Sequence, residues 1–450
     1  MAHNGPTGED KKTSPPVASW KPIPDGVVDV GEDGRIVWSG TIENAPDRSN
    51  VTTHRINGIV MPGMINAHCH TPMVLLRGAG KGLPVDRWLK EVIWPRESRL
   101  TADAVFTGMQ LGATELLTNG ITTSLEMYFF GDAIAEAASS AGLRCLVAPP
   151  VLEDEKLSKL LGPWQAQLES LVATSERWQN NDLIDIALGP HALYSVSKHC
   201  LTRIAEAASD FDMPVHIHLA EQKWEDAAIR ELSSGLSAPQ YLESLGFMET
   251  QLIAAHCVWL SPEDISLMAD NNVKAVHCPC SNTRHASGIA PVHDMCSAGI
   301  SVSIGTDGPV SHNRLDLFEE MRTAIRLARV SSGDAQRFTA AQALWMTTAG
   351  AADVIGRGND LGRLAPGYWA DMVALSVSAS QWHPVIEDED DIFAKVVWSG
   401  SPDSVTDVWV AGRRVVEQGR LTTLDVDAEI AELNTKAARL AGLPDKEQNE

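Results

Sequence analysis

Short apolar runs alternate with helical stretches from Ile59 to about residue 360 of this 450-residue chain, and this alternation most constrains the fold. The apolar runs predict strands at 59–70, 144–150, 183–190, 213–221, 251–258, 273–280 and 300–307. Helical patterns separate them at 102–118, 131–141, 198–209, 225–233, 237–245, 262–271 and 314–330. Repeated strand–helix units imply a parallel sheet with helices outside. So many units favour a closed barrel over an open sheet, and we predict an α/β fold, a distorted (β/α)8 TIM barrel over residues 61–360.

The two ends of the chain differ from this middle region. Residues 27–40 hold two β-runs around a Glu32–Asp33–Gly34 turn, a hairpin pattern, and β-like segments with Gly and Pro turns return after a helical stretch at 339–356. We expect residues 25–60 and 361–450 to form one composite β-sandwich domain with a C-terminal helix. Residues 1–24 are expected to be a disordered tail, 154–182 a helical insertion, and the acidic run 387–391 a solvated loop.

The charged-residue content limits the classes of binding partner that we expect. Lys and Arg number 36 against 59 Asp and Glu, a formal charge of −23. Nucleic acid or an anionic membrane would need a basic footprint, so we expect neither as a partner. The seven cysteines are an odd number and mostly lie in apolar runs, which indicates reduced thiols in a cytoplasmic protein. The sequence shows no apolar signal core and no apolar stretch long enough to span a bilayer.

Histidines stand at the ends of two predicted strands. His68 and His70 close the first barrel strand, and alternate residues on a strand share a face, so both imidazoles point into the barrel. His216 and His218 repeat this spacing on a later strand. Two histidines on one face at this spacing can hold a divalent metal through their ring nitrogens.

Further polar residues stand at strand ends. Glu221 follows His218 by three residues, His256 ends the AAH strand and Asp307 ends SVSIGTDG. In a (β/α)8 barrel the carboxyl ends of the strands carry the active site. For any one histidine, a hydrogen-bonded core residue is the better interpretation. For the whole set, a metal site is the better one, because this many buried polar groups without an ion would be costly.

The motifs PGMINAHCH, HIHLAE, AAH and GTDG occur in this order and resemble the metal-site motifs of the amidohydrolase superfamily. HALYS, HCPCSN, SGIAPV and LDLFEEMR narrow the resemblance. They resemble the branch that contains S-adenosylhomocysteine and 5′-methylthioadenosine deaminases, guanine and 8-oxoguanine deaminases, and triazine hydrolases. The resemblance covers about residues 27–420. The motif set is specific for the superfamily and weak as a marker of substrate.

The resemblance implies one divalent metal ion, usually Zn²⁺, bound by His68, His70, His218 and Asp307, with His216 as a neighbour. Two-metal relatives use a carboxylated lysine or a glutamate on a middle strand. The matching strand here, LIDIALGP, has no lysine, so one metal is favoured. Fe²⁺ or Mn²⁺ can use the same nitrogen and oxygen ligands.

The resemblance also implies catalytic roles. The metal makes hydroxide available from water near neutral pH. Asp307 takes the proton of the water, and His256 orients or polarises it. Glu221 protonates the ring nitrogen beside the attacked carbon and later passes a proton to the departing amine. Ammonia and a ring carbonyl are the products. Cys278 and Cys280 match no zinc-deaminase motif and are expected to be small fillers of a buried strand.

Substrate contacts follow from the same resemblance. The segment DRWLKEVIWPRES resembles the substrate-covering segment of adenosine-type deaminases, where Glu97 matches a glutamate that binds the ribose hydroxyls. His191 matches a histidine that contacts the heterocycle. Trp88 and Trp94 are candidates for stacking on the ligand, although helix packing explains them as well.

Three departures bear on the substrate and the fold. The strand RCLVAPP continues as APPVLEDE, without the second arginine of many S-adenosylhomocysteine deaminases, which favours a neutral nucleoside. His312 stands where relatives commonly have Asn. The usual leading N-terminal strand is missing or replaced, so a reduced sandwich is expected.

We therefore predict a deaminase of a small-molecule heterocycle, with an adenine nucleoside (5′-methylthioadenosine, adenosine or S-adenosylhomocysteine) as the first hypothesis. A free-base or pterin deaminase and an s-triazine amino- or chlorohydrolase are the alternatives. A non-catalytic scaffold on the same barrel is a third class, and the intact set of six site residues argues against it. A homo-oligomer is left open.

Overall fold

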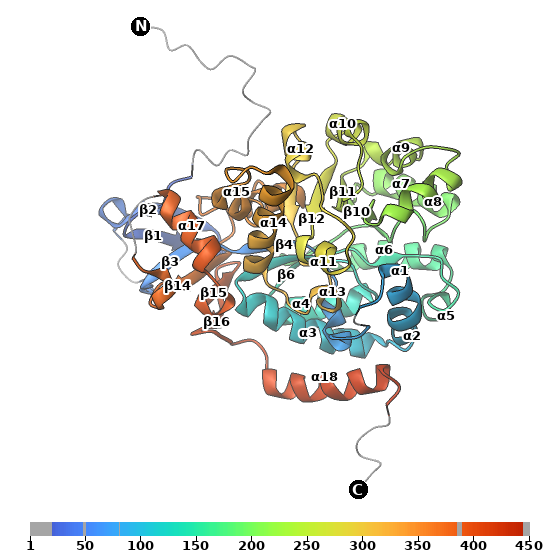
Figure 1. The fold of residues 1–450 in the computed structure, drawn as a ribbon. Helices are drawn as coiled ribbons and strands as arrows, with labels where there is room; N and C mark the ends of the chain where they lie inside the picture. Colours follow the sequence, from blue (N-terminus) through green and yellow to red (C-terminus); the bar gives the residue numbers. More distant parts are fainter. Residues whose placement is uncertain (1–19, 48–50, 81, 385–388, 444–450) are drawn as a thin grey trace.

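The computed structural model describes residues 20–47, 51–80, 82–384 and 389–443. Figure 1 shows a larger body of parallel strands and helices with a smaller β-rich part to one side, where blue N-terminal strands lie beside orange C-terminal ones. The helix α18 (Val426–Leu440) packs against α3 (Ala102–Thr118) along the body. The α/β class with parallel sheets, predicted from the alternation of strands and helices, is confirmed.

Two four-stranded parallel sheets form the centre of the body. In sheet order, the first contains β4 (Met64–Cys69), β5 (Ile121–Glu126), β6 (Arg144–Val147) and β8 (Ile184–Ile186). The second contains β10 (Val215–Leu219), β11 (Leu252–His256), β12 (Lys274–His277) and β13 (Val302–Ile304). Nearly all their residues are buried, as expected for strands covered on both faces.

Backbone contacts connect the two sheets at both edges. A parallel bridge joins Leu188, just after β8, to Val215 of β10. At the other edge, the Asp307 backbone N–H donates to the His68 carbonyl at 3.1 Å. Gly305 permits this approach, because a Cβ there would lie 2.8 Å from backbone atoms of His68. The strand ends that carry the predicted ligands are thereby brought close together.

Helices follow most of the parallel strands. The longer ones, besides α3, are α4 (Gly131–Ala141), α6 (Trp164–Trp178), α7 (Lys198–Asp210), α8 (Lys223–Leu232), α10 (Pro262–Asp270) and α14 (Leu317–Ser332). The shorter ones are α5 (Ser158–Leu161), α9 (Ala238–Ser244), α11 (Pro279–Arg284), α12 (Val292–Ser297), α13 (Pro309–His312), α15 (Ala340–Trp345) and α16 (Ala349–Val354). Thr101, Ser197 and Ser261 begin their helices by accepting a backbone N–H with the side-chain oxygen. The predicted helical insertion at 154–182 is α5 and α6.

An antiparallel sheet combines both ends of the chain. Its order is β17 (Arg420–Leu421), β16 (Arg413–Glu417), β15 (Val405–Val410), β14 (Met372–Ser376) and β3 (Gly58–Pro62). The predicted hairpin is present as β1 (Gly26–Val30) and β2 (Ile36–Thr41). A buried ion pair between Arg144 of β6 and Asp371, 2.9 Å apart, ties the parallel strands to this sheet.

Two predicted elements are divided in the structure. The run 59–70 forms β3 and β4, which separate at Gly63, where the backbone N–H donates to the Asp371 carbonyl. The predicted helix 339–356 is α15 and α16. Thr347 lies in the break and its carbonyl accepts the Ile65 backbone N–H at 2.7 Å, a bond that a continuous helix would not allow.

Other predictions were wrong or incomplete. The sequence ITTSLE forms the fully buried strand β5. We did not predict this strand because two threonines and a serine interrupt its short apolar pattern. The strand 273–280 ends at His277, since Pro279 begins α11, so Cys280 is not a strand residue. In the acidic run, 387–388 lie outside the described residues, and the rest begins the helix α17 (Glu389–Ser399) in place of a loop. Residues 1–19 of the predicted tail also lie outside the described residues.

Among the described residues, the chain forms no helix with the length and apolar character needed to cross a membrane.

Candidate active site

The four predicted metal ligands come from three strands. His68 lies in β4 and His70 directly follows it, His218 lies in β10, and Asp307 follows β13. The strands are parallel and joined at both edges, so their carboxyl ends meet at one end of the body. All four side chains therefore lie side by side.

Backbone carbonyls fix the tautomers of two of the histidines. His70 Nδ1 donates to the Met127 carbonyl at 2.5 Å, and His218 Nδ1 donates to the His191 carbonyl at 2.8 Å. A carbonyl oxygen only accepts, so each neutral ring keeps its lone pair on Nε2. The two Nε2 atoms face each other at 3.3 Å.

A relay of hydrogen bonds gives His68 the same tautomer. His216 Nδ1 donates to the Ile253 carbonyl at 3.1 Å, so its Nε2 accepts from His68 Nδ1 at 2.7 Å. The lone pair of His68 is then on Nε2, a buried atom that has no hydrogen-bond partner. His216 lies behind His68 and orients it, as a second layer of side chains does around many metal ligands.

These atoms fit a cation. Asp307 Oδ1 lies 3.2 Å from His70 Nε2 and 3.7 Å from His68 Nε2, and the ligand atoms of these three residues lie within 4.8 Å of one another. Three imidazole lone pairs and a carboxylate oxygen face one another. None of these atoms carries a hydrogen, so they cannot form hydrogen bonds among themselves. An ion satisfies them all, and this donor set suits Zn²⁺ and also Fe²⁺ or Mn²⁺.

The electrostatics of the cluster also favour positive charge. Burial lowers the pKa of His68 to about 3. Burial lowers the pKa of His70 too, but the Asp307 carboxylate outweighs it, and the pKa is raised. Burial raises the pKa of Asp307, yet contacts with His68 and His70 hold it well below its usual range. Asp307 is therefore an anion beside rings that burial tends to keep neutral.

The backbone at the site is strained and well anchored. Asp307 and His256 have φ of +61° and +72°, in the left-handed region. Each such non-glycine residue costs about 1–3 kcal/mol and persists only where its surroundings enforce it. Ser281 Oγ donates to Asp307 Oδ2 at 2.5 Å, and the Gly308 N–H donates to Oδ1 at 2.6 Å. These two bonds orient the carboxylate towards the histidines.

Glu221 and His256 lie beside the cluster. Glu221 Oε1 accepts from Gln222 Nε2 at 3.0 Å and from Ser287 Oγ at 3.2 Å. Its Oε2 is 3.9 Å from His256 Nε2. His256 Nδ1 donates to Asn282 Oδ1 at 3.0 Å, so its Nε2 is directed towards Glu221 and the histidine cluster. One carboxylate oxygen of Glu221 thus remains available for proton transfer.

A pocket opens above these groups. Its walls are mainly apolar and aromatic, with Met73, Val85, Trp88, Leu89, Ile93, Trp94, Phe129, Leu152 and Tyr194. Among the described residues that line it, none is lysine or arginine. The described wall residues therefore offer no lysine or arginine side chain to an anionic group of a ligand.

The four candidate substrate contacts, Glu97, His191, Trp88 and Trp94, all line this pocket. Tyr128 Oη donates to Glu97 Oε1 at 2.9 Å, and burial raises the pKa of Glu97 to about 7. His191 Nδ1 pairs with Ser195 Oγ at 2.9 Å, and burial lowers the pKa of His191 to about 4. The Trp88 Nε1–H donates to the Ala79 carbonyl, which fixes the indole at the wall.

The sequence interpretation missed several residues of the site. Glu126 ends the unpredicted strand β5, and its Oε1 accepts the Thr71 N–H at 2.5 Å. Burial raises the pKa of Glu126 to about 7. Tyr128 follows on the same segment. Ser281 and Asn282 belong to HCPCSN, which served only as a family motif, although a polar pair after a buried strand is a usable signal.

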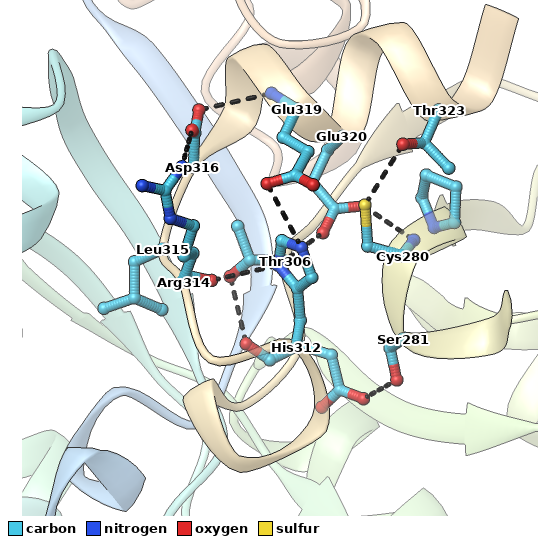
Figure 2. A network of polar contacts seen from close by, with 12 residues as sticks. Cys280, Ser281, Thr306, His312, Arg314, Leu315, Asp316, Glu319, Glu320 and Thr323 are labelled. Atoms are coloured by element: carbon cyan, nitrogen blue, oxygen red, sulfur yellow. Dashed lines mark hydrogen bonds and ion pairs between the residues drawn. The ribbon is translucent and has the colours of Figure 1, made fainter. Parts of the chain in front are cut away.

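His312 takes no part in the pocket. Figure 2 shows it near Cys280, Glu319 and Glu320, and it is not among the residues that line the pocket. Its neighbour Ser311 lines the pocket.

Known proteins resemble the chain over most of its length. The sequence profile of the amidohydrolase family matches residues 59–415. A 5-methylthioadenosine/S-adenosylhomocysteine deaminase of Syntrophomonas wolfei subsp. wolfei is 36% identical over 86% of this chain and 88% of its own. A 5′-deoxyadenosine deaminase of Methanopyrus kandleri is 34% identical over 92% and 95%. The crystal structure of an adenosine deaminase from Xanthomonas campestris with bound zinc is 33% identical, covers 93% of this chain and 94% of its own, and has a TM-score of 0.87.

Proposed function

Because the chain belongs to the amidohydrolase family, we propose that it is a metal-dependent aminohydrolase of adenine nucleosides. The reaction breaks the exocyclic C–N bond, forms a C–O bond with water and releases ammonia. The names of the curated relatives support this substrate class. The observation that carries the proposal is the convergence of three imidazole lone pairs and the Asp307 carboxylate at the base of the pocket that Glu221 lines.

One divalent metal ion would be held by His68, His70, His218 and Asp307. Zinc is the first choice, because the donor set suits it and the adenosine deaminase of Xanthomonas campestris binds zinc. When bound, such an ion activates water as a nucleophile near neutral pH.

Two carboxylates would move the protons. Asp307, anionic in the folded protein, accepts a proton from the attacking water. Glu221 Oε2, the oxygen without a hydrogen bond from Gln222 or Ser287, gives a proton to the ring nitrogen beside the attacked carbon. The proton that Asp307 accepts then goes to the departing amine through Glu221. The second proton of the water, carried by the new hydroxyl group, goes to Glu221 as the ring carbonyl forms, so both carboxyl groups return to their starting states.

His256 would orient the water. Asn282 accepts from His256 Nδ1 and so turns its Nε2 towards the reacting atoms. In this arrangement His256 holds the water by a hydrogen bond at Nε2, and the strained backbone keeps the ring in place.

The pocket wall would select the nucleoside. Glu97 accepts hydrogen bonds from the ribose hydroxyls with Oε2, since Oε1 is used by Tyr128. His191 contacts the heterocycle, and Trp88 stacks on the ligand. Leu152 and the other apolar wall residues suit a small neutral 5′ group, as in 5′-methylthioadenosine, 5′-deoxyadenosine or adenosine. The carboxylate of S-adenosylhomocysteine would meet no lysine or arginine among the described lining residues.

For the architecture, we propose that the two parallel sheets close into one distorted (β/α)8 barrel over residues 61–360. The bridge between Leu188 and Val215 and the bond from Asp307 to His68 support closure at both edges. We further propose that residues 25–60 and 361–450 form a composite β-sandwich, in which the β1–β2 hairpin packs with the five-stranded sheet. Ile36 of β2 belongs to the same buried apolar cluster as Met372 and Trp409, which supports this packing.

We also propose a cytoplasmic location, with small heterocyclic substrates as the partners of the protein. All seven cysteines are free, which suits a reducing compartment. The charge of −23 argues against nucleic acid. Self-association is left open.

The test is a substrate panel with the zinc-loaded protein. Adenosine, 5′-methylthioadenosine, 5′-deoxyadenosine and S-adenosylhomocysteine are compared with guanine, a pterin and an s-triazine, by ammonia release and by the change in ultraviolet absorbance. We expect turnover of the adenine nucleosides, with a lower kcat/KM for S-adenosylhomocysteine than for 5′-methylthioadenosine. Turnover of only free bases, pterins or triazines would refute the nucleoside assignment, and activity on lactam rings alone would refute deamination.

A further inference from the structure

A second group of side chains that can bind a metal lies among residues that do not line the pocket (Figure 2). Cys280 belongs to α11, His312 ends α13, and Glu319 and Glu320 belong to α14. The ligand atoms of Cys280, His312 and Glu319 lie within 4.8 Å of one another. A thiol, an imidazole and a carboxylate from three helices therefore face one point.

The contacts of His312 define the centre of this group. Its Nε2 lies 3.4 Å from Glu319 Oε2, and its Nδ1 lies 3.6 Å from Glu320 Oε1 and 3.3 Å from the Arg314 carbonyl. Two carboxylates and an imidazole at these separations attract positive charge.

The buried side chain of Glu320 gives a second observation, separate from the distances between ligand atoms, that favours a cation here. Its side chain is fully buried, and Oε1, the oxygen near His312, has no hydrogen-bond partner. The other oxygen, Oε2, accepts the Cys280 backbone N–H at 3.0 Å. A buried carboxylate oxygen without a donor is costly, and a cation in the group would satisfy it.

An ion can enter this group from solvent. The Glu319 side chain is 40% exposed and that of His312 is 11% exposed, while Cys280 and Glu320 lie beneath them. Burial and the nearby Glu320 raise the pKa of the Cys280 thiol, so without a metal the sulfur keeps its proton. A bound metal replaces that proton, which leaves to solvent, and no electron transfer is involved. Thr323 Oγ1, 3.3 Å from Sγ, can then donate to the thiolate.

We propose that Cys280, His312 and Glu319 form a second site for a thiophilic divalent transition metal of the Zn²⁺ class, beside the buried carboxyl group of Glu320. Sulfur, nitrogen and oxygen ligands in a set of three or four match zinc coordination. The site differs from the histidine cluster, whose donors are nitrogen and oxygen alone. An ion here would tie α13 to α11 and α14 and so hold the turn whose Ser311 lines the pocket.

Cd²⁺ titration of the holoenzyme tests this site. Cd²⁺ bound to a thiolate gives a charge-transfer absorption band in the ultraviolet, and the proposed catalytic ligands include no sulfur. Cys296→Ser serves as the common background, because Cys296 is the cysteine that is not fully buried. Cys280→Ser and His312→Asn are then added singly. Thermal melting of each variant confirms that it is folded before titration.

We expect the Cys296→Ser background to bind one equivalent of Cd²⁺ per chain beyond the catalytic metal and to show the thiolate band. Both added substitutions should remove the extra equivalent and the band. A band absent from the background, or retained after either substitution, would overturn the proposal. The measurement needs no substrate, so its outcome is independent of whether the protein deaminates nucleosides.

Discussion

The floor and the cover of the pocket are built in different ways. The floor consists of His68, His70, His218, Asp307 and Glu221, which stand on or just after parallel strands and are fixed by hydrogen bonds. The cover is residues 85–97, which form α1 (Val85–Trp88), a π-helical turn η5 (Leu89–Ile93) and α2 (Trp94–Glu97).

The cover is held in place mainly by apolar packing and makes few hydrogen bonds with the floor. Several of its residues are partly exposed, while the floor is almost wholly buried. π-helical turns are uncommon and often occur at functional sites. The proposed reaction would then depend on residues fixed by strands, and the proposed choice of substrate on a segment that can change without disturbing those strands. Substitutions in the two regions should therefore have different kinetic effects.

The largest effect is expected from Glu221→Gln on the floor. An amide cannot carry the proton that Oε2 transfers, so kcat should fall by about 10²–10⁴ while the metal content stays unchanged. The measurements are kcat with an adenine nucleoside and metal analysis of the purified variant. Glu231→Gln, an exposed glutamate on α8, is the matched control. Loss of the metal from Glu221→Gln would mean that Glu221 is a ligand and not the proton carrier.

A smaller effect on the floor is expected from His216→Ala. His68 would lose the acceptor that holds its proton on Nδ1, so its Nε2 would no longer be fixed as a ligand. Metal affinity should fall by about 10–100-fold, as measured by competition with a chelator. His216→Gln, which offers an amide oxygen as acceptor, should restore part of the affinity. Equal losses for both variants would contradict an orienting role.

Residue patterns alone predicted that the floor residues would meet, whereas the cover was predicted only from the family resemblance. Alternation along a strand placed His68 with His70 and His216 with His218, and strand polarity brought them towards Asp307. The tautomers were not predictable, because they depend on the carbonyls of Met127, His191 and Ile253, which only the fold brings near.

The remaining errors have similar causes. The strand that ends at Glu126 was missed because four of its residues are polar and its apolar pattern is short. The second cluster was not predictable because Cys280, His312 and Glu319 come together only where α11, α13 and α14 pack. For the cover, Glu97 and Trp88 were expected from resemblance alone, and no periodicity indicates a π-helical turn.

On the cover, Glu97→Gln should raise KM for nucleosides and leave kcat nearly unchanged. A hydrogen bond to a charged group is worth about 1.5–3 kcal/mol, so KM should rise by about 10-fold or more. Free purine bases, which lack the ribose, should be unaffected if they bind at all. A fall in kcat with unchanged KM would mean that Glu97 acts in the reaction like the floor residues, and would contradict the proposed difference between floor and cover.

Glu97 should also make the KM for nucleosides depend on pH. Burial raises the pKa of Glu97 to about 7, so the carboxylate, the stronger acceptor for ribose hydroxyls, dominates above this pH. KM for nucleosides should therefore increase as the pH falls below 7, with the larger change at lower pH. In Glu97→Gln this dependence should flatten, because the amide does not titrate. A wild-type KM that is constant from pH 6 to 8, on the order of one unit either side of that pKa, would contradict the assignment.

The smallest effect is expected from Trp88→Leu. Aromatic stacking contributes about 0.5–1.5 kcal/mol, so the loss of the indole should raise KM by about 2–10-fold with little change in kcat. The indole also packs 5.0 Å from the His285 ring and donates to the Ala79 carbonyl, so a modest fall in Tm should accompany the change. Trp398→Leu, a partly exposed tryptophan on α17, is the control for a general loss of stability. A lower Tm with unchanged KM would show that Trp88 only supports the cover, and substrate choice would then depend on Glu97 and the apolar wall alone.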